Sequence, residues 1–476
     1  MGANTGSHAA TGVCHIVPPY ILQALANDPD RTVAARARAS LVVDDQVRIE
    51  RRAQPSARPG RPTVVPDAAS GPHRVISDAQ GRTTTPGRAA RTEGDPATGD
   101  PATDEAYAGL GDTWTLWHQA YGRDSLDGAG LALLGTVHYG KDYDNAFWDG
   151  TQMVFGDGDG VIFNRFTISV DVIGHELAHG VTSYTADLTY RGQSGALNES
   201  MSDVFGSLVK QLAREHDAAD ADWLIGEGLL TSQVNGRGLR DMLHPGTAYD
   251  DPRLGKDPQP EHMSGYVVTA SDNGGVHINS GIPNRAFALA ATSVGGPAWT
   301  LAGQVWWDVL SGAEITPACD FATFAKLTVA AAAARFGSGS DIEQAVASAW
   351  QSVGVLTATR RKSVRATRAA RATAAALAAP SAGPSGETSV LVRRTGGVAG
   401  VQTQRQVTLG ELPERDRQAW TTLLTAQTLV ESPATSDRPD AFCYQVSSPQ
   451  LGLDTLVAEP HLPSRVRHLL EKTLRH

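Results

Sequence analysis

The chain has 476 residues, of which 41% are hydrophobic and 19% charged, a composition typical of a globular protein with a sizeable core and, at roughly 150 residues per domain, about three domains. A net charge of −10 argues against nucleic acid as the main partner, because phosphate binding requires a positive surface, and no apolar run reaches the roughly 20 residues that span a bilayer. The three cysteines, Cys14, Cys319 and Cys443, are odd in number and widely spaced, so no disulfide framework is expected.

Residues 1–68 are expected to form a separate N-terminal piece. Two prolines, Pro18 and Pro19, stiffen an extended entry, and short helices are predicted over residues 20–25 and 32–41. The four prolines in residues 54–66 predict an exposed linker that a protease could cut. The start of the chain has neither a basic segment nor an apolar stretch, so no ordinary secretory signal is predicted, although export by another route stays open.

Residues 69–173 are expected to form a β-rich lobe. They contain short β-type runs at residues 135–139 and 151–155, while the spacing of apolar residues predicts a helix over residues 107–121. The Gly-Asp-Gly-Asp-Gly segment at residues 156–160 indicates a tight turn, because no strand–loop–helix context supports phosphate binding there.

A candidate metal site follows, in the sequence His-Glu-Leu-Ala-His that begins at His175. Residues four apart share one face of a helix, so His175 and His179 can bind one ion, and Glu199, 20 residues later, is the natural third ligand. This set leaves a fourth position for water, from which Glu176 could take a proton. Asp203 lies one helical turn beyond Glu199 and can orient a ligand histidine. The short motif also occurs on solvated helices, but the apolar segment before it favours zinc.

Helical patterns dominate residues 174–356, which are expected to form a second lobe. The strongest of them cover residues 282–291, 301–310, 321–335 and 341–353. Clefts between two lobes are common binding sites for peptides, so we expect substrate to bind between this lobe and the β-rich one.

Residues 357–387 and 388–476 are expected to be a linker and a small α+β domain. The linker is rich in alanine, arginine and proline, and its basic charge indicates a tether rather than a nucleic-acid site. The predicted elements of the last domain are a hairpin over residues 390–400 and 406–409, a helix over 413–424, a strand over 442–446, and a helix that begins at Pro463.

Five motifs in this order resemble the thermolysin-like zinc metallopeptidases. They are residues 145–148, 156–160, 175–179, 198–203 and 272–281, and the likeness extends from about residue 107 to residue 355. The resemblance implies an α+β fold with two lobes and the zinc helix between them. The short N-terminal piece with Val-Pro-Pro-Tyr-Ile at residues 17–21 is similar to the protealysin subgroup, which implies a propeptide; a flexible leader is the alternative.

The resemblance assigns roles to further residues. It implies that Tyr190 and His277 donate hydrogen bonds to the oxyanion, that Asp272 holds His277 in its productive tautomer, and that Asn198 lies beside the zinc ligands. Asn145 and Ala146 would align an extended substrate, and Arg240 would bind its carbonyl.

The resemblance also implies an apolar pocket for the residue after the scissile bond. The positions that match this pocket are Phe163, Phe166, Val172, Ile225 and Leu239. Because all five are apolar, cleavage before bulky residues such as leucine or phenylalanine is predicted; plain core packing is the alternative, above all for Val172.

The sequence allows two readings each for calcium binding and for the role of Cys14. Asp171, Asp222 and Glu227 match part of the family's calcium cluster, but Lys210 stands at another position of it, and an ammonium there opposes two dications. No paired calcium site is therefore expected, and one weak ion remains compatible with the sequence. The Cys14 thiolate could cap the zinc in the precursor, with a small buried residue as the alternative.

The last domain resembles emfourin, a small protein inhibitor of protealysin-type peptidases, through the Arg-Arg-Thr-Gly-Gly-Val-Ala-Gly sequence at residues 393–400. The chain is therefore predicted to be a monomeric zinc endopeptidase that is made as a precursor, inhibited by its propeptide and secreted like its family. The alternative readings are an enzyme that its own C-terminal domain also inhibits, an inactive zinc-binding scaffold that acts through an adaptor domain, and a cytoplasmic location.

Overall fold

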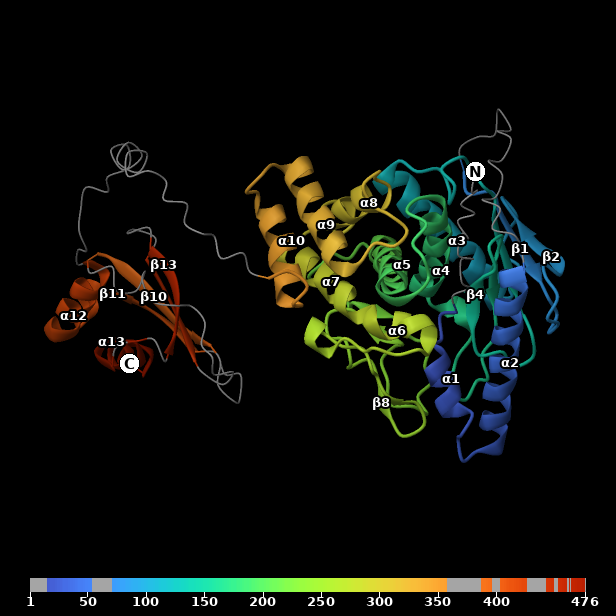
Figure 1. Ribbon diagram of the computed structural model, residues 1–476, viewed down its shortest axis with the longest axis horizontal. Helices are drawn as coiled ribbons and strands as arrows, with labels where there is room; N and C mark the ends of the chain where they lie inside the picture. Colours follow the sequence, from blue (N-terminus) through green and yellow to red (C-terminus); the bar gives the residue numbers. More distant parts are fainter. Residues whose placement is uncertain are drawn as a thin grey trace, which may run out of the picture. The chain divides into compact units, whose positions relative to one another are not determined.

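In the computed structural model, the described residues are 15–53, 71–357, 387–395, 403–425, 442–448, 453–459, 462 and 464–475. The chain divides into two compact units, Met1–Thr359 and Arg360–His476 (Figure 1). Cys14, the expected linker with four prolines and most of the expected tether lie outside the described residues.

The β-rich lobe is built on one five-stranded sheet. Its strand order is β2-β1-β3-β5-β4, with parallel pairing of β3 to β1 and to β5 and antiparallel pairing at both ends. The strands are β1 Arg74–Asp78, β2 Arg88–Thr92, β3 Leu133–Val137, β4 Ala146–Trp148 and β5 Met153–Phe155. The run expected at residues 135–139 is thus β3, shifted by two residues, and β4 is an edge strand with one side available for another chain segment.

Two long helices at the centre of the first unit position the metal-binding motif. They are α4 (Val170–Tyr184) and α5 (Gly192–Ala213), and α3 (Pro101–Tyr121) packs against both and against the sheet (Figure 1). The helices α4 and α5 approach closely because glycines face each other: a Cβ on Gly206 would lie 2.4 Å from the main-chain oxygen of Asp171. This approach brings a side chain of α5 to the histidines of α4.

The remaining elements of the first unit form the helical lobe, and the four predicted helices of this lobe are all present. They are α7 Gly281–Val294, α8 Ala302–Leu310, α9 Phe321–Phe336 and α10 Asp341–Ser352. Before them come β6 Leu224–Ile225, β7 Arg240–Asp241, β8 Asp250–Asp251, β9 Gly255–Lys256, η2 Met263–Gly265 and α6 Asp272–Asn279, while η1 Phe166–Ile168 precedes α4. The two-lobed α+β fold is confirmed.

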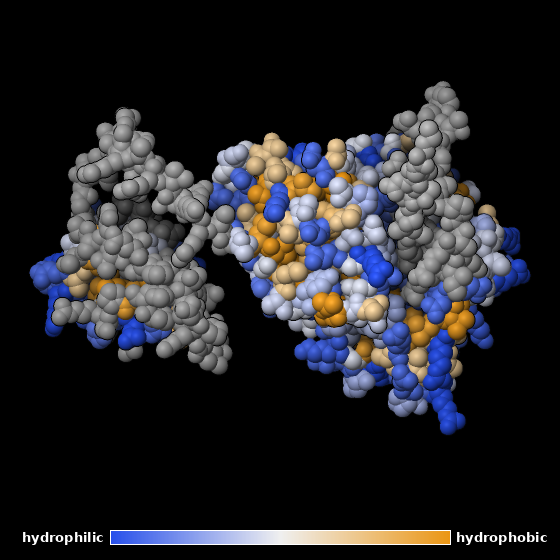
Figure 2. All heavy atoms as spheres, in the orientation of Figure 1, coloured by the Kyte–Doolittle hydropathy of each residue, from blue (hydrophilic) through white to orange (hydrophobic). Residues whose placement is uncertain are grey.

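Within the described residues, no helix is both long and apolar enough to cross a membrane. Figure 2 shows polar residues over much of the visible face, with an apolar group near α9 and α10.

The N-terminal piece contains two helices, α1 (Pro19–Leu25) and α2 (Arg31–Ala53). The first matches the prediction, but α2 continues about twelve residues beyond the predicted end at residue 41, because residues 42–53 contain neither glycine nor proline to stop it. Several α1 and α2 side chains, including Ile21, Leu22 and Val33, belong to the main apolar core, so this piece packs on the rest of the first unit.

The second unit is a four-stranded antiparallel sheet with two helices. The strand order is β11-β10-β12-β13, and the elements are β10 Ser389–Thr395, β11 Thr403–Thr408, η3 Leu409–Glu411, α12 Glu414–Thr425, β12 Cys443–Ser448, β13 Leu453–Ala458 and α13 Ser464–Arg475. Trp420 is fully buried and its Nε1 donates to Thr473 Oγ1 at 3.1 Å, which joins α12 to α13. The predicted hairpin, helix and terminal helix are present. The strand β13 was not predicted, because its apolar residues alternate only in part.

The close approach of α4 and α5 gives a stability test. Gly206→Ala should lower the free energy of unfolding by about 1–3 kcal/mol and weaken zinc binding, because the new methyl group meets rigid main chain. Gly111→Ala is the control: its Cβ would lie 2.3 Å from Arg74 Nη1, the far end of a side chain that can move. Thermal unfolding with and without zinc measures both, and equal losses in the two variants would contradict this explanation of the helix packing.

Candidate metal centre and substrate cleft

Three buried side chains converge where α4 meets α5. His175 and His179 lie one turn apart on α4, with their Nε2 atoms 3.1 Å from each other. The Glu199 carboxylate, from α5, lies 3.6 Å from each of these nitrogens. All three ligand atoms lie within 4.8 Å of one another, so they can hold one metal ion.

Hydrogen bonds fix both imidazoles as metal ligands. His175 Nδ1 donates to Asp203 Oδ1 at 2.8 Å, and His179 Nδ1 donates to Asn198 Oδ1 at 2.8 Å. The Asn198 amide is itself oriented, because its Nδ2 donates to the Leu188 carbonyl at 3.0 Å. Both Nε2 lone pairs therefore point at each other and at a carboxylate, an arrangement that a cation stabilises and that fits the zinc preference for two imidazoles and one carboxylate.

Electrostatics agree with this set of ligands. Burial lowers the pKa of His179 to about 4, so its imidazole is neutral at pH 7, as a metal ligand must be. Burial opposes ionisation of Glu199, but the imidazoles of His277, His179 and His175 lower the pKa of its carboxyl to about 2. The centre therefore presents the neutral His179 imidazole and the negative Glu199 carboxylate.

Glu176 lies beside these ligands with one oxygen available. Its Oε2 accepts from the Trp148 main-chain N–H at 3.0 Å, which ties α4 to the edge strand β4. Its Oε1 is buried and has no hydrogen-bond partner among the described residues. Burial, and next the Glu199 charge, raise the pKa of Glu176 well above its usual value. A carboxylate oxygen in this position can accept a proton from a water molecule.

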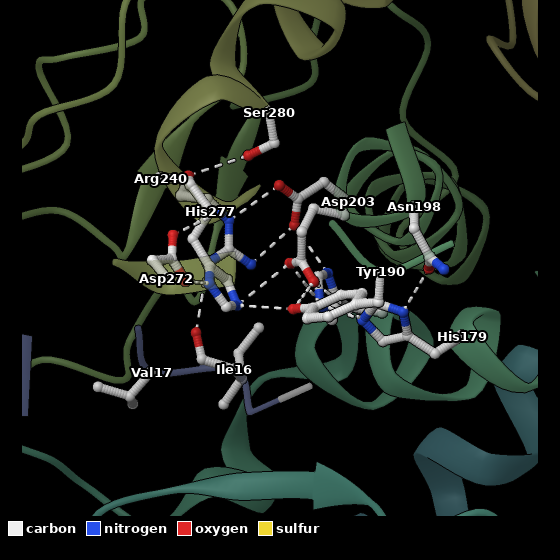
Figure 3. A network of polar contacts seen from close by, with 12 residues as sticks. Ile16, Val17, His179, Tyr190, Asn198, Asp203, Arg240, Asp272, His277 and Ser280 are labelled. Atoms are coloured by element: carbon white, nitrogen blue, oxygen red, sulfur yellow. Dashed lines mark hydrogen bonds and ion pairs between the residues drawn. The ribbon is translucent and has the colours of Figure 1, made fainter. Parts of the chain in front are cut away.

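A second polar group faces the centre from the helical lobe. His277 Nδ1 is 2.6 Å from Asp272 Oδ1, and the Asp272 carboxylate also accepts from the His277 main-chain N–H at 2.9 Å. His277 Nε2 lies 3.2 Å from the Tyr190 hydroxyl, which in turn donates to Glu199 (Figure 3). The structure thus brings Tyr190, His277 and Asp272 together as expected.

Asp203 joins the metal centre to Arg240. Arg240 donates to both Asp203 oxygens at 2.8 Å, and Asp203 Oδ1 also binds His175 (Figure 3). Asn284 Nδ2 supplies a fourth hydrogen bond to this carboxylate, at 2.8 Å. Asn284 was missed in the sequence, since nothing in its spacing relates it to Asp203.

The expected substrate cleft contains the beginning of the N-terminal piece. Ile16 N donates to the Ala146 carbonyl at 3.1 Å, and Arg240 Nη1 donates to the Ile16 carbonyl at 3.3 Å. Val17 N donates to Asn145 Oδ1 at 2.9 Å, and Asn145 Nδ2 lies 3.3 Å from the Val17 carbonyl. The three residues expected to align a substrate, Asn145, Ala146 and Arg240, therefore all contact one extended segment, which sequence reasoning did not foresee.

The five expected pocket residues are buried in the main apolar core, together with Ile16: Phe163, Phe166, Val172, Ile225 and Leu239. Ile225 and Arg240 are paired residues of β6 and β7, so this part of the core lies next to the arginine that contacts Ile16.

The expected calcium ligands are bound to cationic side chains. Lys210 Nζ lies 2.8 Å from Asp171 Oδ2 and 2.8 Å from Asp222 Oδ1, and it donates to the Leu224 carbonyl at 2.7 Å. Glu227 is paired with Arg214 at 2.7 Å.

Comparison with known proteins agrees with this geometry. Residues 70–183 match the family model of the thermolysin metallopeptidase catalytic domain, residues 186–355 match that of its alpha-helical domain, and residues 392–474 match the Emfourin model. An extracellular metalloprotease of Pectobacterium carotovorum subsp. carotovorum is 49% identical over 72% of this chain and 96% of its own length. Protease PrtS of Photorhabdus sp. (strain Az29) is 46% identical over 71% of this chain and 91% of its own length.

One similar solved structure is that of a precursor. The precursor of protealysin, a metalloproteinase from Serratia proteamaculans, is 50% identical and superposes with a TM-score of 0.65 over 72% of this chain and all of its own. The chain therefore belongs to the thermolysin family of metalloendopeptidases, and carries an emfourin domain at its C-terminal end.

Proposed function

We propose that this metalloendopeptidase cleaves peptide bonds on the N-terminal side of bulky apolar residues, with Glu176 as its general base. The observation that carries the proposal is the convergence of His175, His179 and Glu199 with the available Glu176 oxygen beside them. Zinc held by the three ligands would supply an acidified water molecule and polarise the scissile carbonyl. Glu176 takes the proton of that water and returns it to the leaving amine.

The surrounding residues stabilise charge and hold the substrate in this proposal. His277, held by Asp272, and Tyr190 donate hydrogen bonds to the developing oxyanion. Arg240 binds the carbonyl of the residue after the scissile bond, while Asn145 and Ala146 bind the extended main chain. The contacts of these three residues with Ile16 and Val17 support their roles, because they are main-chain contacts that any peptide could make.

Two features support the proposed cleavage preference and the proposed latency of the precursor. Ile16 is a fully buried β-branched residue beside the Arg240 contact, which fits an apolar pocket for the residue after the bond. The same contacts keep other peptides out while the N-terminal piece is in place, so the precursor is proposed to be latent. Because one relative named above is an extracellular metalloprotease, we propose that this chain is exported as well.

Glu176→Gln tests the catalytic role. Zinc content should stay at one ion per chain, while hydrolysis of a leucine-containing peptide should fall by at least about a hundredfold, because the glutamine amide cannot take up the proton. The assay uses zinc-loaded protein after tryptic removal of the N-terminal piece. The exposed Glu215→Gln is the matched control, and an active, zinc-loaded Glu176→Gln variant would refute the role of Glu176.

The emfourin domain favours a second, regulatory function. We propose that residues 388–476 inhibit the peptidase lobes of the same polypeptide, on the strength of the family match at residues 392–474. An adaptor role, with or without an active peptidase, is the competing proposal.

Removal of this domain separates these possibilities. With the N-terminal piece removed from both chains, the chain that ends at Gly386 should cleave the reporter peptide several times faster than the chain that ends at His476, and addition of the separate domain should reverse the gain. An unchanged rate would favour the adaptor, and no hydrolysis by either chain would favour an inactive scaffold.

Calcium is proposed to be unnecessary for this enzyme, because the Lys210 ammonium already neutralises Asp171 and Asp222. Burial opposes the charge of Lys210, but these two carboxylates raise its pKa, so the ammonium stays protonated. A single weak ion near Glu227 remains the alternative.

Lys210→Ala tests the calcium proposal. The variant should lose about 3–5 kcal/mol of stability, because Asp171 stays buried without its partner, and millimolar calcium should restore part of it. Melting curves of the full chain should show no calcium effect, and exposed Lys326→Ala serves as the control. A clear rise in the melting temperature of the unmodified chain with calcium would refute the proposal.

A further inference from the structure

The N-terminal segment lies in the cleft in a defined register. His15 and Phe147 form an antiparallel bridge, and the Ile16 N–H bonds to the Ala146 carbonyl. Since the two strands are antiparallel, each step from Ala146 toward Trp148 along β4 is a step toward the N-terminal side of Ile16.

Two fixed groups lie on opposite sides of the His15–Ile16 bond. Arg240 contacts the carbonyl on the C-terminal side of Ile16, at 3.3 Å. Glu176 Oε2 accepts from the Trp148 N–H at 3.0 Å. Because Phe147 pairs with His15, Trp148 lies one residue farther along β4, on the N-terminal side of His15. The bond between His15 and Ile16 therefore lies between the carbonyl-binding arginine and the carboxylate that receives a proton.

We infer that the His15–Ile16 bond is a self-processing site, which the enzyme hydrolyses in its own precursor. The inference rests on the proposed function, and it adds that the N-terminal piece enters the cleft in the direction of a substrate. Two later bonds of the segment are less suitable. Those that follow Val17 and Pro18 lead into Pro18 and Pro19, which have no N–H to bond to a strand.

The reaction consumes one water molecule and needs no other reactant. Its hydroxyl oxygen bonds to the His15 carbonyl carbon, and the bond between that carbon and the Ile16 nitrogen breaks. Glu176 takes the proton released by the water and delivers it to the Ile16 nitrogen. The products are a new carboxylate at His15 and a new amino terminus at Ile16.

The part after the cut has its own anchors, so the cleaved precursor should stay latent. Asp44 of α2 is fully buried and accepts from the Tyr143 hydroxyl at 2.6 Å and from Asn145 Nδ2 at 3.0 Å. Farther along the surface, Arg253 Nε donates to Asp28 at 2.6 Å. None of these contacts involves the bond that is cut.

The test uses the full-length chain, purified without metal and then loaded with zinc. Intact mass spectrometry should show a product that begins at Ile16, and its rate of formation should not depend on protein concentration, as a reaction within one chain requires. Glu176→Gln should remain intact. In the zinc-free protein, hydrogen exchange should find the Ile16 amide protected by its bond to Ala146.

Two substitutions of Ile16 sharpen the test. Ile16→Leu keeps an apolar side chain and the N–H, so the cut should persist, whereas Ile16→Pro removes the N–H and should stop it. If zinc-loaded protein hydrolyses a reporter peptide after tryptic removal of the N-terminal piece, yet the precursor keeps His15–Ile16 intact, the inference is wrong and the proposed function stands. If the reporter is also left intact, the proposed function fails and the inference fails with it.

Discussion

The close packing of α4 against α5 is the constraint on which the site depends. Neither helix carries a complete metal centre: α4 supplies two imidazoles, and α5 supplies the carboxylate of Glu199. The distance between the helices is set by glycine, because a Cβ on Gly206 would clash with the main chain of α4 at Asp171. The chemistry of the site thus follows from a backbone approach that only the smallest residue permits.

Asp203 connects the candidate metal centre to Arg240. Its two oxygens accept four hydrogen bonds, from His175, from Asn284 and twice from Arg240. One carboxylate therefore orients His175 of the candidate metal centre and Arg240, which donates to the Ile16 carbonyl. Burial opposes its charge, but Arg240 and His175 hold the Asp203 pKa well below its usual range, so the link stays ionised. The candidate metal centre and the contact of Arg240 with the N-terminal segment share one buried network in this unit.

Much of the site could be predicted from the sequence, because helical periodicity places residues four apart on one face, and this was enough for His175 and His179. The helices of the second lobe were also predicted nearly to the residue, since their apolar spacing is regular. Contacts between distant segments could not be predicted in this way. Asp44 lies beyond the predicted end of its helix at residue 41, and Asn284 has no local signal. Only the fold brings them to Asn145 and Asp203.

The central claim is that two imidazoles and one carboxylate hold a single zinc ion. X-ray absorption at the zinc edge, on full-length protein whose folding and metal content have been checked, tests it most directly. We expect one zinc per chain, with two imidazole nitrogens at about 2.0–2.1 Å and carboxylate oxygen completing the protein ligands. Folded protein that binds no stoichiometric zinc, or zinc whose spectrum lacks the two imidazoles, would contradict the account.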